Sequence, residues 1–472
     1  MPAQSENHTM PPTRRAVMQT AATAAAAATA SGFSAEAIHE LKLAVIGCGD
    51  AGRKVLKQAI AVVARGVKAK LVALCDVDSR QTDKALEILP PKSDPPRIYD
   101  YSKDHGYTDL LKAERPDIVV VATPDHWHAL IATDALRAEA NVFLELPVCH
   151  TILEGGAIQR AATKYKRLVQ VNSQRRLSQP TASAKAFIKA RKAGKIGFVR
   201  IFDHGQGGQA EPAKSNTPEP GRLAWDAWCG PARKRPYNDL ITADFSKFLD
   251  YGNGVIAAEG VPWFDQVLWI LDEKWPRRVF STGGRPILGR PVEIEAANGS
   301  AAKSVKPAQT TDCPDHQSAA FEFESTTVVW EHRSFGGHGA ETGDPAGCYF
   351  YGSEGILHLP KNGAWTFYPS DSRAAVVASP PPAEGEEADS EDKRIRDLWA
   401  DLLESIQFEQ RPKADLEAAR RSTNMALLAM ISLKTGRSLQ WDGEKEAIIG
   451  DDFANGLLRR DYRPGYNYPV LA

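Results

Sequence analysis

Short apolar runs alternate with helical stretches between residues 41 and 171 of the chain. Helices are predicted at Ala51–Val63, Ser79–Leu89, His128–Arg137 and Leu153–Lys166. Strands are predicted at Leu43–Ile46, Leu71–Cys75, Ile118–Ala122, Val142–Glu145 and Leu168–Val171. Strands that alternate with helices in this way form a parallel sheet that the helices cover. The pattern therefore predicts a doubly wound α/β domain.

The pattern changes after Pro180. Helices are predicted at Ala182–Ala193, Arg394–Ile406 and Ala414–Thr435, with a solvated loop at Ser379–Asp392. Strands are predicted at Val199–Asp203, Arg278–Thr282, Ala319–Glu324, Thr327–His332, Tyr349–Gly352 and Gly355–Leu359. We expect these strands to form a larger, mainly antiparallel sheet in a second α/β domain.

The size and charge of the chain narrow the class of protein. Its 472 residues exceed what one core usually supports, so two domains are expected, at 39–178 and 179–472. Lys and Arg number 58 against 59 Asp and Glu, which leaves no basic field for nucleic acid or an anionic membrane. No run of about 18 strongly apolar residues predicts a stable membrane span. Small molecules are therefore the expected partners.

The six cysteines form no CxxC pair and no metal-ligand spacing, so no metal is expected. Three of them, Cys48, Cys75 and Cys149, lie in or beside predicted strands and should act as small buried apolar residues. A disulfide among the other three, Cys229, Cys313 and Cys348, stays open if the protein is exported.

Residues 1–38 have the composition of a targeting segment. The run Thr13–Gln19 places paired arginines between a polar residue and apolar residues, and an Ala/Thr stretch follows through Ala30. It resembles a twin-arginine signal, which predicts an exported, periplasmic protein. The alternative is a disordered Ala-rich tail, and a protein without a functional signal would be cytoplasmic.

The run Gly47–Gly52 matches G-x-G-x-x-G directly after a predicted strand and directly before a predicted helix. Gly47 permits the tight turn, Gly49 lets the backbone approach a pyrophosphate, and Gly52 allows close packing of the helix. Asp76 ends the next predicted strand, where a carboxylate would bind a ribose diol and repel a 2′-phosphate. These residues predict a dinucleotide site with NAD favoured over NADP; a flavodoxin-like turn without a dinucleotide is the alternative.

Further runs resemble the glucose-fructose oxidoreductase, inositol dehydrogenase and rhizopine-catabolism (Gfo/Idh/MocA) family. They are Ala122–His128, Glu145–Pro147, Asn172–Arg176, Trp225–Pro231, Arg235–Tyr237, Trp330–His332 and Arg421–Thr423. The resemblance spans nearly the whole chain after the N-terminal segment. It implies an N-terminal Rossmann domain for NAD and a C-terminal α/β domain whose sheet walls the substrate cleft and supports a homo-oligomer.

The chain departs from this family where the family places its acid–base residues. Leu146 occupies the position at which the family's dehydrogenases carry a lysine that hydrogen-bonds the substrate hydroxyl. In the run Gly252–Asp265, Ala258 and Pro262 align with the family's catalytic Asp and His, and only Asp265 is kept. Acid–base assistance is worth about 10²–10⁴-fold, so either other residues have taken over or ordinary alcohol oxidation is poor.

The candidate site residues follow from the motifs and the resemblance. Glu259, beside the lost Asp, is the candidate general base, with a surface or helix N-terminal carboxylate as the alternative; the catalytic candidates are Glu259 and Asp265. The candidate cofactor residues are Gly47, Gly49, Asp50, Ala51, Gly52, Asp76, Thr123, Pro124, His126, His128, Glu145 and Gln174. The candidate substrate residues are Arg175, Trp228, Tyr237 and Trp263, although tryptophans are more often part of a core.

Two functional hypotheses remain. The first is an exported NAD-dependent enzyme of this family that acts on a sugar, glycoside or cyclitol. Because free NAD is scarce outside the cytoplasm, its cofactor would be tightly held and its chemistry redox-neutral, with transient oxidation of the substrate. The second is a catalytically degenerate relative that binds NAD and serves as a sugar-binding or regulatory protein.

Overall fold

The computed structural model describes residues 40–91, 93–101, 106–205, 214–289, 308–336, 344–361, 364–381 and 387–469. The predicted export signal lies outside these residues. In the described ranges, no helix combines the length and apolar character that crossing a membrane requires. All six cysteines are buried and free, so no disulfide joins Cys229, Cys313 or Cys348.

The N-terminal domain is built on a six-stranded parallel sheet with the order β3-β2-β1-β4-β5-β6. Its strands are β1 (Leu41–Ile46), β2 (Ala69–Cys75), β3 (Arg97–Tyr99), β4 (Ile118–Val121), β5 (Asn141–Leu144) and β6 (Val169–Val171). The order reverses between β1 and β4, and ligands of such sheets bind outside the carboxyl ends of the strands at this point. This confirms the predicted Rossmann sheet.

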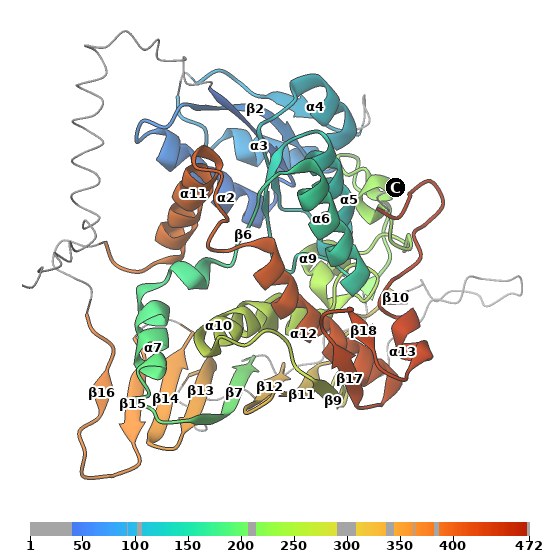
Figure 1. Ribbon diagram of the computed structural model, residues 1–472. Coiled ribbons are helices and arrows are strands. Elements are labelled where there is room, and N and C mark those ends of the chain that lie inside the picture. Colours follow the sequence, from blue (N-terminus) through green and yellow to red (C-terminus); the bar gives the residue numbers. More distant parts are fainter. Residues whose placement is uncertain are drawn as a thin grey trace, which may run out of the picture. The chain divides into compact units, whose positions relative to one another are not determined.

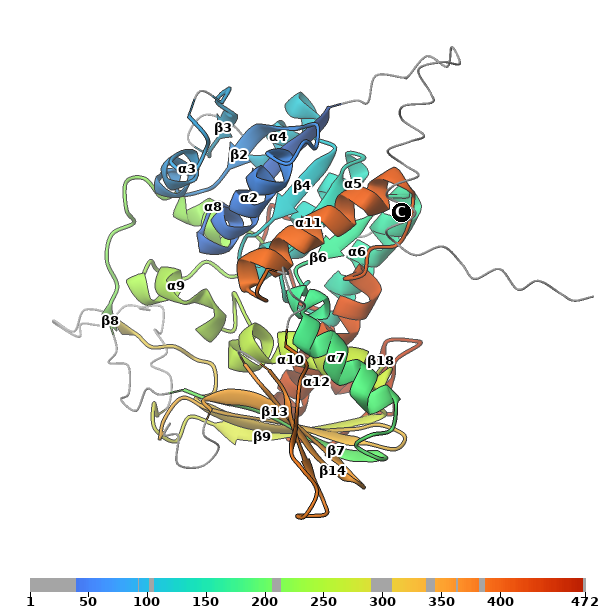
Figure 2. The ribbon, with the colours of Figure 1, turned by 90° about the vertical axis from the view of Figure 1, so that its left-hand side faces the viewer.

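Helices on both faces of the sheet connect its strands (Figure 2). They are α2 (Asp50–Val63), α3 (Ser79–Leu86), α4 (Tyr107–Glu114), α5 (Asp125–Arg137) and α6 (Ile152–Tyr165). Helix α6 starts with a capping box in which the carboxylate of Glu154 accepts a hydrogen bond from the backbone N–H of Thr151. Helix α5 begins before its predicted start, because Pro124 precedes it and Asp125 occupies its first turn.

A helix from far along the chain completes the core of this domain. Helix α11 (Glu391–Gln407) lies alongside α2 (Figure 2). Its Trp399 stacks on Phe143 of β5, with ring centroids 4.9 Å apart, and donates a hydrogen bond to the carbonyl of Val55 at 3.0 Å. The Rossmann core therefore includes a segment that the sequence pattern assigns to residues 179–472.

The second domain is built on a ten-stranded sheet with the order β16-β15-β14-β13-β7-β12-β11-β9-β17-β18. Only the β7–β12 pair is parallel, which confirms the mainly antiparallel prediction. The strands are β7 (Ile196–His204), β9 (Arg278–Gly284), β11 (His316–Glu322), β12 (Thr327–Arg333), β13 (Ala346–Gly352), β14 (Gly355–Pro360), β15 (Thr366–Pro369), β16 (Val377–Ala378), β17 (Leu439–Asp442) and β18 (Ala447–Ile448).

Helices α7 (Gln179–Lys189), α10 (Val261–Leu271) and α12 (Leu416–Thr435) cover one face of this sheet and separate it from the Rossmann domain (Figure 1). Large apolar side chains remain exposed on the sheet, among them Phe280 and Tyr368. The remaining short elements are β8 (Lys214–Ser215), β10 (Ala308–Gln309), α8 (Trp225–Cys229), α9 (Asp239–Ala243), α13 (Asp452–Gly456), a π-helix (Ile256–Gly260) and two 3-10 turns (Gln174–Leu177 and Phe245–Lys247).

Candidate functional site

The glycine loop between β1 and α2 is shaped by contacts that exclude side chains. Gly47 has a φ of +90°, and a Cβ on it would lie 2.5 Å from the carbonyl oxygen of Ala122. A Cβ on Gly52 would lie 1.9 Å from the carbonyl oxygen of Gly47. A Cβ on Gly49 would meet nothing within 4 Å. The loop is therefore closed on its protein side and open at Gly49, where the N-terminus of α2 begins.

A cavity of about 500 Å³ opens at this loop. The predicted cofactor residues that line it are Gly47, Gly49, Asp50, Ala51, Asp76, Thr123, Pro124 and Glu145, together with the predicted substrate residue Trp228. The structure thus brings together residues from the carboxyl ends of β1, β2, β4 and β5, as the fold requires of a dinucleotide site.

At the β2 end of the cavity, Asp76 is held by the backbone. Its carboxylate accepts hydrogen bonds from the N–H groups of Cys48 at 2.7 Å and Asp78 at 2.9 Å. Burial raises the pKa of Asp76 to about 6, although these two hydrogen bonds oppose the rise. Asp78, which is paired with Arg80, also lines the cavity together with Arg53 and Lys84, so the carboxylate of Asp76 is the group that would repel a 2′-phosphate. This geometry favours NAD over NADP.

The polar groups of the cavity fit a dinucleotide. The hydroxyl oxygen of Thr123 is buried, lines the cavity and has no hydrogen-bond partner in the protein. The open face of Gly49 and the uncapped first turn of α2 leave N–H groups for a pyrophosphate. Helix α2, Asp76 and Thr123 would therefore contact the phosphate, ribose and nicotinamide parts of NAD in turn.

Glu145 and Leu146 mark the end of the cavity beyond β5. The side-chain amide of Asn172 donates to both carboxylate oxygens of Glu145, at 2.9 and 3.1 Å, while its own Oδ1 is buried without a partner. Burial raises the pKa of Glu145 to about 7, and the hydrogen bonds from Asn172 act against it. A carboxyl group that titrates near neutrality therefore stands next to Leu146, which cannot exchange a proton.

Residues 222–245, which we call the roof segment, extend from the second domain and line one side of the cavity. Leu223, Trp228 and Asp244 of this segment are among its lining residues. The backbone N–H of Ala224 donates to the carbonyl of Val77 at 2.8 Å, next to the β2 end of the cavity. The cavity is therefore walled by both domains, and a bound dinucleotide would lie beneath the roof segment.

Two predicted cofactor residues, His126 and His128, do not line the cavity. They hold the backbone around it in place. His126 makes a hydrogen bond of 2.9 Å to the carbonyl of Trp228 in the roof segment, and burial lowers its pKa to about 3. His128 lies 2.8 Å from each of the carbonyls of Thr123 and Pro147. The structure thus corrects their predicted contact with the cofactor, because both side chains are fully buried beneath the loop.

Four charged side chains outside the cavity lining interact with one another: Arg175, Asp203, Glu259 and Lys361, which we call the polar cluster. Arg175 follows Asn172 by three residues, and its guanidinium stacks on the ring of Trp263 at 4.3 Å. The ammonium group of Lys361 lies 3.1 Å from the carboxylate of Glu259. The cluster therefore joins the end of β6 to the π-helix and to strands β7 and β14.

Asp203 is a partly buried member of the polar cluster. Its Oδ2 atom has no hydrogen-bond partner, and burial together with the charge of Glu259 raises its pKa to about 6. Glu259 is 47% exposed and projects from a π-helix, a conformation frequent at functional sites. One carboxyl group whose pKa is raised to about 6 and one accessible carboxylate are the components of acid–base chemistry.

Asp265 has a different role from the one predicted. Its side chain is 1% exposed and forms a two-point ion pair with Arg176, with N–O distances of 2.7 and 2.9 Å. It lines neither the cavity nor the polar cluster, so a catalytic contact with substrate is excluded by its burial. Asp265 fixes α10 against the turn after β6.

Four other predicted residues lie outside the cavity. Gly52 supports the loop from behind, and Gln174 hydrogen-bonds Glu391 and Arg394 of α11. Trp263 is 1% exposed and serves as the platform under Arg175, while Tyr237 packs in the aromatic cluster of the roof segment. Both aromatic side chains pack against other residues of the protein. The sequence pattern alone could not distinguish this packing from the predicted contact with substrate.

Sequence reasoning missed Asp203, Lys361 and the role of Asn172. Asp203 was included only as the end of a predicted strand, and Lys361 follows β14, so neither belongs to a motif. For Asp203 the sequence offered one indication. The alternation of polar and apolar residues in β7 places this acidic residue at a position that should face the helices. Within the described ranges, no group of three or more His, Cys, Asp or Glu is placed to hold a metal ion.

Comparison with known proteins agrees with this geometry. Residues 41–173 match the family model described as an oxidoreductase family with an NAD-binding Rossmann fold, which confirms NAD as the cofactor type. A protein of Shewanella oneidensis named alpha-N-acetylgalactosaminidase is 32% identical over 124 residues, or 26% of this chain and 26% of that protein. The chain thus matches about a quarter of the length of its curated relatives.

Two solved structures resemble most of the chain. The oxidoreductase domain protein from Kribbella flavida has a TM-score of 0.61 at 18% identity and covers 84% of this chain and 98% of its own. The myo-inositol 2-dehydrogenase from Lactobacillus plantarum has a TM-score of 0.57 at 16% identity and covers 85% and 99%. At these identities the matches establish the fold, including the α/β class of both domains.

Proposed function

Residues 41–173 belong to the Gfo/Idh/MocA family of NAD-binding oxidoreductases, and from this premise we propose that the protein is an enzyme that acts on a sugar, glycoside or cyclitol with a tightly held NAD. The observation that carries the proposal is a cofactor cavity whose Glu145 is hydrogen-bonded to Asn172, three residues before Arg175 of the polar cluster. The similarity of the N-terminal domain to a protein named alpha-N-acetylgalactosaminidase supports a glycoside as the substrate class.

Each charged side chain of the polar cluster has a role in the proposed reaction. Bound NAD supplies the acceptor and later the donor of a hydride at one substrate carbon, so that the overall reaction is redox-neutral. Glu259 takes the proton of the substrate hydroxyl at that carbon and returns it at the end of the turnover. Lys361 and Arg175 stabilise negative charge on the substrate oxygens, and Asp203 in its protonated form donates a hydrogen bond to a neighbouring substrate oxygen.

This assignment accounts for the residues that the chain lacks. Leu146, Ala258 and Pro262 replace the lysine, Asp and His that the related dehydrogenases use. In our proposal the proton transfers move to Glu259 and Asp203, which approach from the π-helix and from β7. In this proposal, the chain has lost the family's lysine, Asp and His because Glu259 and Asp203 now perform the proton transfers of a different reaction.

Tight retention of the cofactor is the second part of the proposal. The roof segment is fastened to the Rossmann domain by the Ala224–Val77 and His126–Trp228 hydrogen bonds and by an ion pair between Arg222 and Asp83 at 2.5 Å. Release of a dinucleotide requires these contacts to open. Such retention suits the exported, periplasmic location that we propose from the N-terminal segment, and we further propose a homo-oligomer.

A catalytically degenerate sugar-binding protein is the second candidate. Leu146, which lines the cavity, favours it, because an apolar side chain there can bind but not exchange protons. The two candidates differ in whether the bound cofactor changes its redox state.

The experiment follows the absorbance of bound reduced nicotinamide while the protein meets a panel of glycosides and free sugars. We expect transient reduction with at least one glycoside, and its loss in Glu259→Gln, with Glu404→Gln as an exposed control. Cycling that survives in Glu259→Gln would remove Glu259 as the base. No absorbance change with any sugar would favour the binding protein.

A further inference from the structure

Arg175 of the polar cluster forms no ion pair with a carboxylate in the part of the chain that the structure describes. Its guanidinium stacks on the ring of Trp263 at 4.3 Å, and its Nη1 atom donates one long hydrogen bond, of 3.5 Å, to the carbonyl of Lys361. A guanidinium has five N–H donors, so the others remain unmet. Burial, together with the charge of Arg394, lowers the pKa of Arg175 to about 10. The protein therefore holds a positive charge here that lacks its usual compensation.

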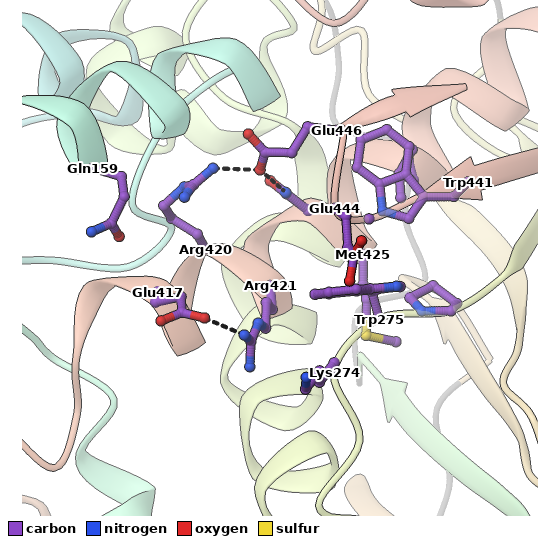
Figure 3. Close-up of a pocket in the computed structure, with 14 residues that line it drawn as sticks. Gln159, Lys274, Trp275, Glu417, Arg420, Arg421, Met425, Trp441, Glu444 and Glu446 are labelled. Carbon is purple, nitrogen blue, oxygen red and sulfur yellow. Dashed lines mark hydrogen bonds and ion pairs between the residues drawn. The ribbon is translucent and has the colours of Figure 1, made fainter. Parts of the chain in front are cut away.

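Other largely buried arginines of this protein have a carboxylate partner. Arg176, the residue next to Arg175, forms the two-point ion pair with Asp265. Arg420, which lines a separate hollow, pairs with Glu446 (Figure 3). The chain thus supplies these arginines with carboxylates from its own residues. At Arg175 the position of the carboxylate is left for a ligand.

The unmet donors of Arg175 are within reach of such a ligand. The side chain is partly exposed, and its Nε and Nη2 atoms are not among the polar atoms that the protein encloses without a partner. One face of the guanidinium lies on Trp263 and Nη1 turns toward Lys361, so the edge formed by Nε and Nη2 remains for a ligand. Two parallel N–H groups on a planar edge match the two oxygens of a carboxylate.

The neighbouring charges favour a ligand with a single negative charge. Lys361 and Glu259 neutralise each other at 3.1 Å, and Arg394 has a carboxylate partner of its own at 2.8 Å. Asp203 is protonated in the proposed reaction, which leaves the charge of Arg175 unbalanced. A carboxylate balances this charge, whereas a doubly charged phosphate would leave a negative charge close to Glu259.

We propose that the substrate is an acidic sugar, a uronic acid or its glycoside, and that Arg175 binds its carboxylate. The inference rests on the proposed function and narrows its substrate class from sugars in general to those that carry a carboxylate. The carboxylate accepts hydrogen bonds from Nε and Nη2 of Arg175, and the sugar hydroxyls face Lys361 and Glu259. Arg175 determines specificity, because a neutral sugar of the same shape leaves its donors unmet.

The test compares the dissociation constants of four glycosides, measured by saturation-transfer NMR on the full-length, NAD-loaded protein. Methyl glucuronide and methyl galacturonide differ only at C6 from methyl glucoside and methyl galactoside. We expect at least one uronide to bind about tenfold more tightly than its neutral counterpart. In Arg175→Gln this preference should disappear, while the control Arg65→Gln, at an exposed position after α2, should keep it.

The unfolding temperature shows whether Arg175 has a structural role instead. Because Arg175 has no ion pair to lose, Arg175→Gln should change this temperature little, whereas Arg176→Gln leaves Asp265 buried and unpaired and should lower it strongly. Arg175→Lys keeps a charge but loses the planar two-donor edge, so we expect it to lose most of the preference. This second variant keeps the test decisive if Arg175→Gln does not fold.

The outcomes distinguish this inference from the proposed reaction. Uronides that bind with the expected preference but never reduce the bound NAD would support the role of Arg175 and count against the reaction. A neutral glycoside that reduces the bound NAD and binds as tightly as its uronide would keep the reaction and overturn the acidic substrate. Equal binding of methyl galactoside 6-sulfate, or a preference for uronides that survives in both Arg175 variants, would also overturn it.

Discussion

At the scale of single residues, neighbouring glycines of the loop after β1 have different tasks. Gly52 is held against the carbonyl of Gly47, whereas Gly49 faces open space beside the cavity. The motif in the sequence identifies both glycines and the class of ligand. It cannot tell which glycine serves packing and which serves the ligand, since that depends on the approach of the loop to β4.

Alanine at these two positions should therefore separate folding from binding. In Gly52→Ala the new Cβ clashes with backbone, and we expect a loss of stability of about 2 kcal/mol or more. In Gly49→Ala the Cβ enters the space of the pyrophosphate, so the unfolding temperature should hold while NAD affinity falls at least tenfold. Calorimetric unfolding and NAD titration check both results, and a Gly49→Ala protein that binds NAD normally would contradict the pyrophosphate placement.

Glu145 predicts a pH dependence of cofactor binding. Burial raises its pKa to about 7, so it is protonated below that pH and negatively charged above it. A negative charge near the positively charged nicotinamide ring favours NAD over its reduced form. We expect the affinity for NAD to rise about tenfold between pH 6 and pH 8 and Glu145→Gln to flatten the profile.

Isothermal titration with NAD at a series of pH values measures this effect, with Glu404→Gln as the control for a charge elsewhere. A profile that keeps its slope in Glu145→Gln would assign the titration to another group. Asp76 is one such group in the cavity, since burial raises its pKa to about 6.

At the scale of elements, the sequence predicts the sheets better than the contacts between distant segments. Apolar periodicity located most strands within a few residues, because burial on both faces requires it. Strand β3 and helix α4 were missed, because both are short and follow stretches without clear periodicity. Helix α10 was also missed, because its first residues were interpreted only as the counterpart of a family motif. Pro262 is in fact suited to the first turn of a helix.

The place of α11 against α2 lies beyond sequence patterns. Its amphipathic face predicts a helix, but nothing in it names Phe143 as the partner of Trp399. The polar cluster has the same origin, because Asp203 and Lys361 meet Glu259 only through the folding of the second sheet. A sequence motif describes residues within one segment, whereas the polar cluster is assembled from four segments that are distant in the sequence.

The ion pair between Arg176 and Asp265 is predicted to be structural. Removing one partner of a buried pair leaves an uncompensated charge, so Asp265→Asn should lower the free energy of unfolding by about 3–5 kcal/mol. The double variant Arg176→Met with Asp265→Leu should recover much of that loss. Urea unfolding measures both, and a fully stable Asp265→Asn protein with lost turnover would restore Asp265 as a catalytic residue.

At the scale of the whole molecule, the cofactor cavity is shared between the two domains. The Rossmann domain supplies most of the lining residues, and the roof segment from the second domain lines one side of the cavity. Segment 222–245 contains two of the runs that resemble the family, yet their part in enclosing the cofactor follows only from the hydrogen bonds of Ala224 and Trp228. In our account, these contacts of the roof segment keep NAD bound through each turnover. NAD then acts as a resident cofactor and not as a co-substrate.

The most direct test is the nicotinamide nucleotide content of the purified protein, measured by mass spectrometry after prolonged gel filtration without added cofactor. The account predicts stoichiometric NAD(H) in the protein as isolated. It also predicts that Arg222→Ala, which removes only the exposed ion pair between the roof segment and Asp83, lowers this content slightly, because such a pair contributes about 0–1 kcal/mol. A protein that folds normally and carries no NAD(H) would contradict the resident cofactor and the chemistry proposed from it.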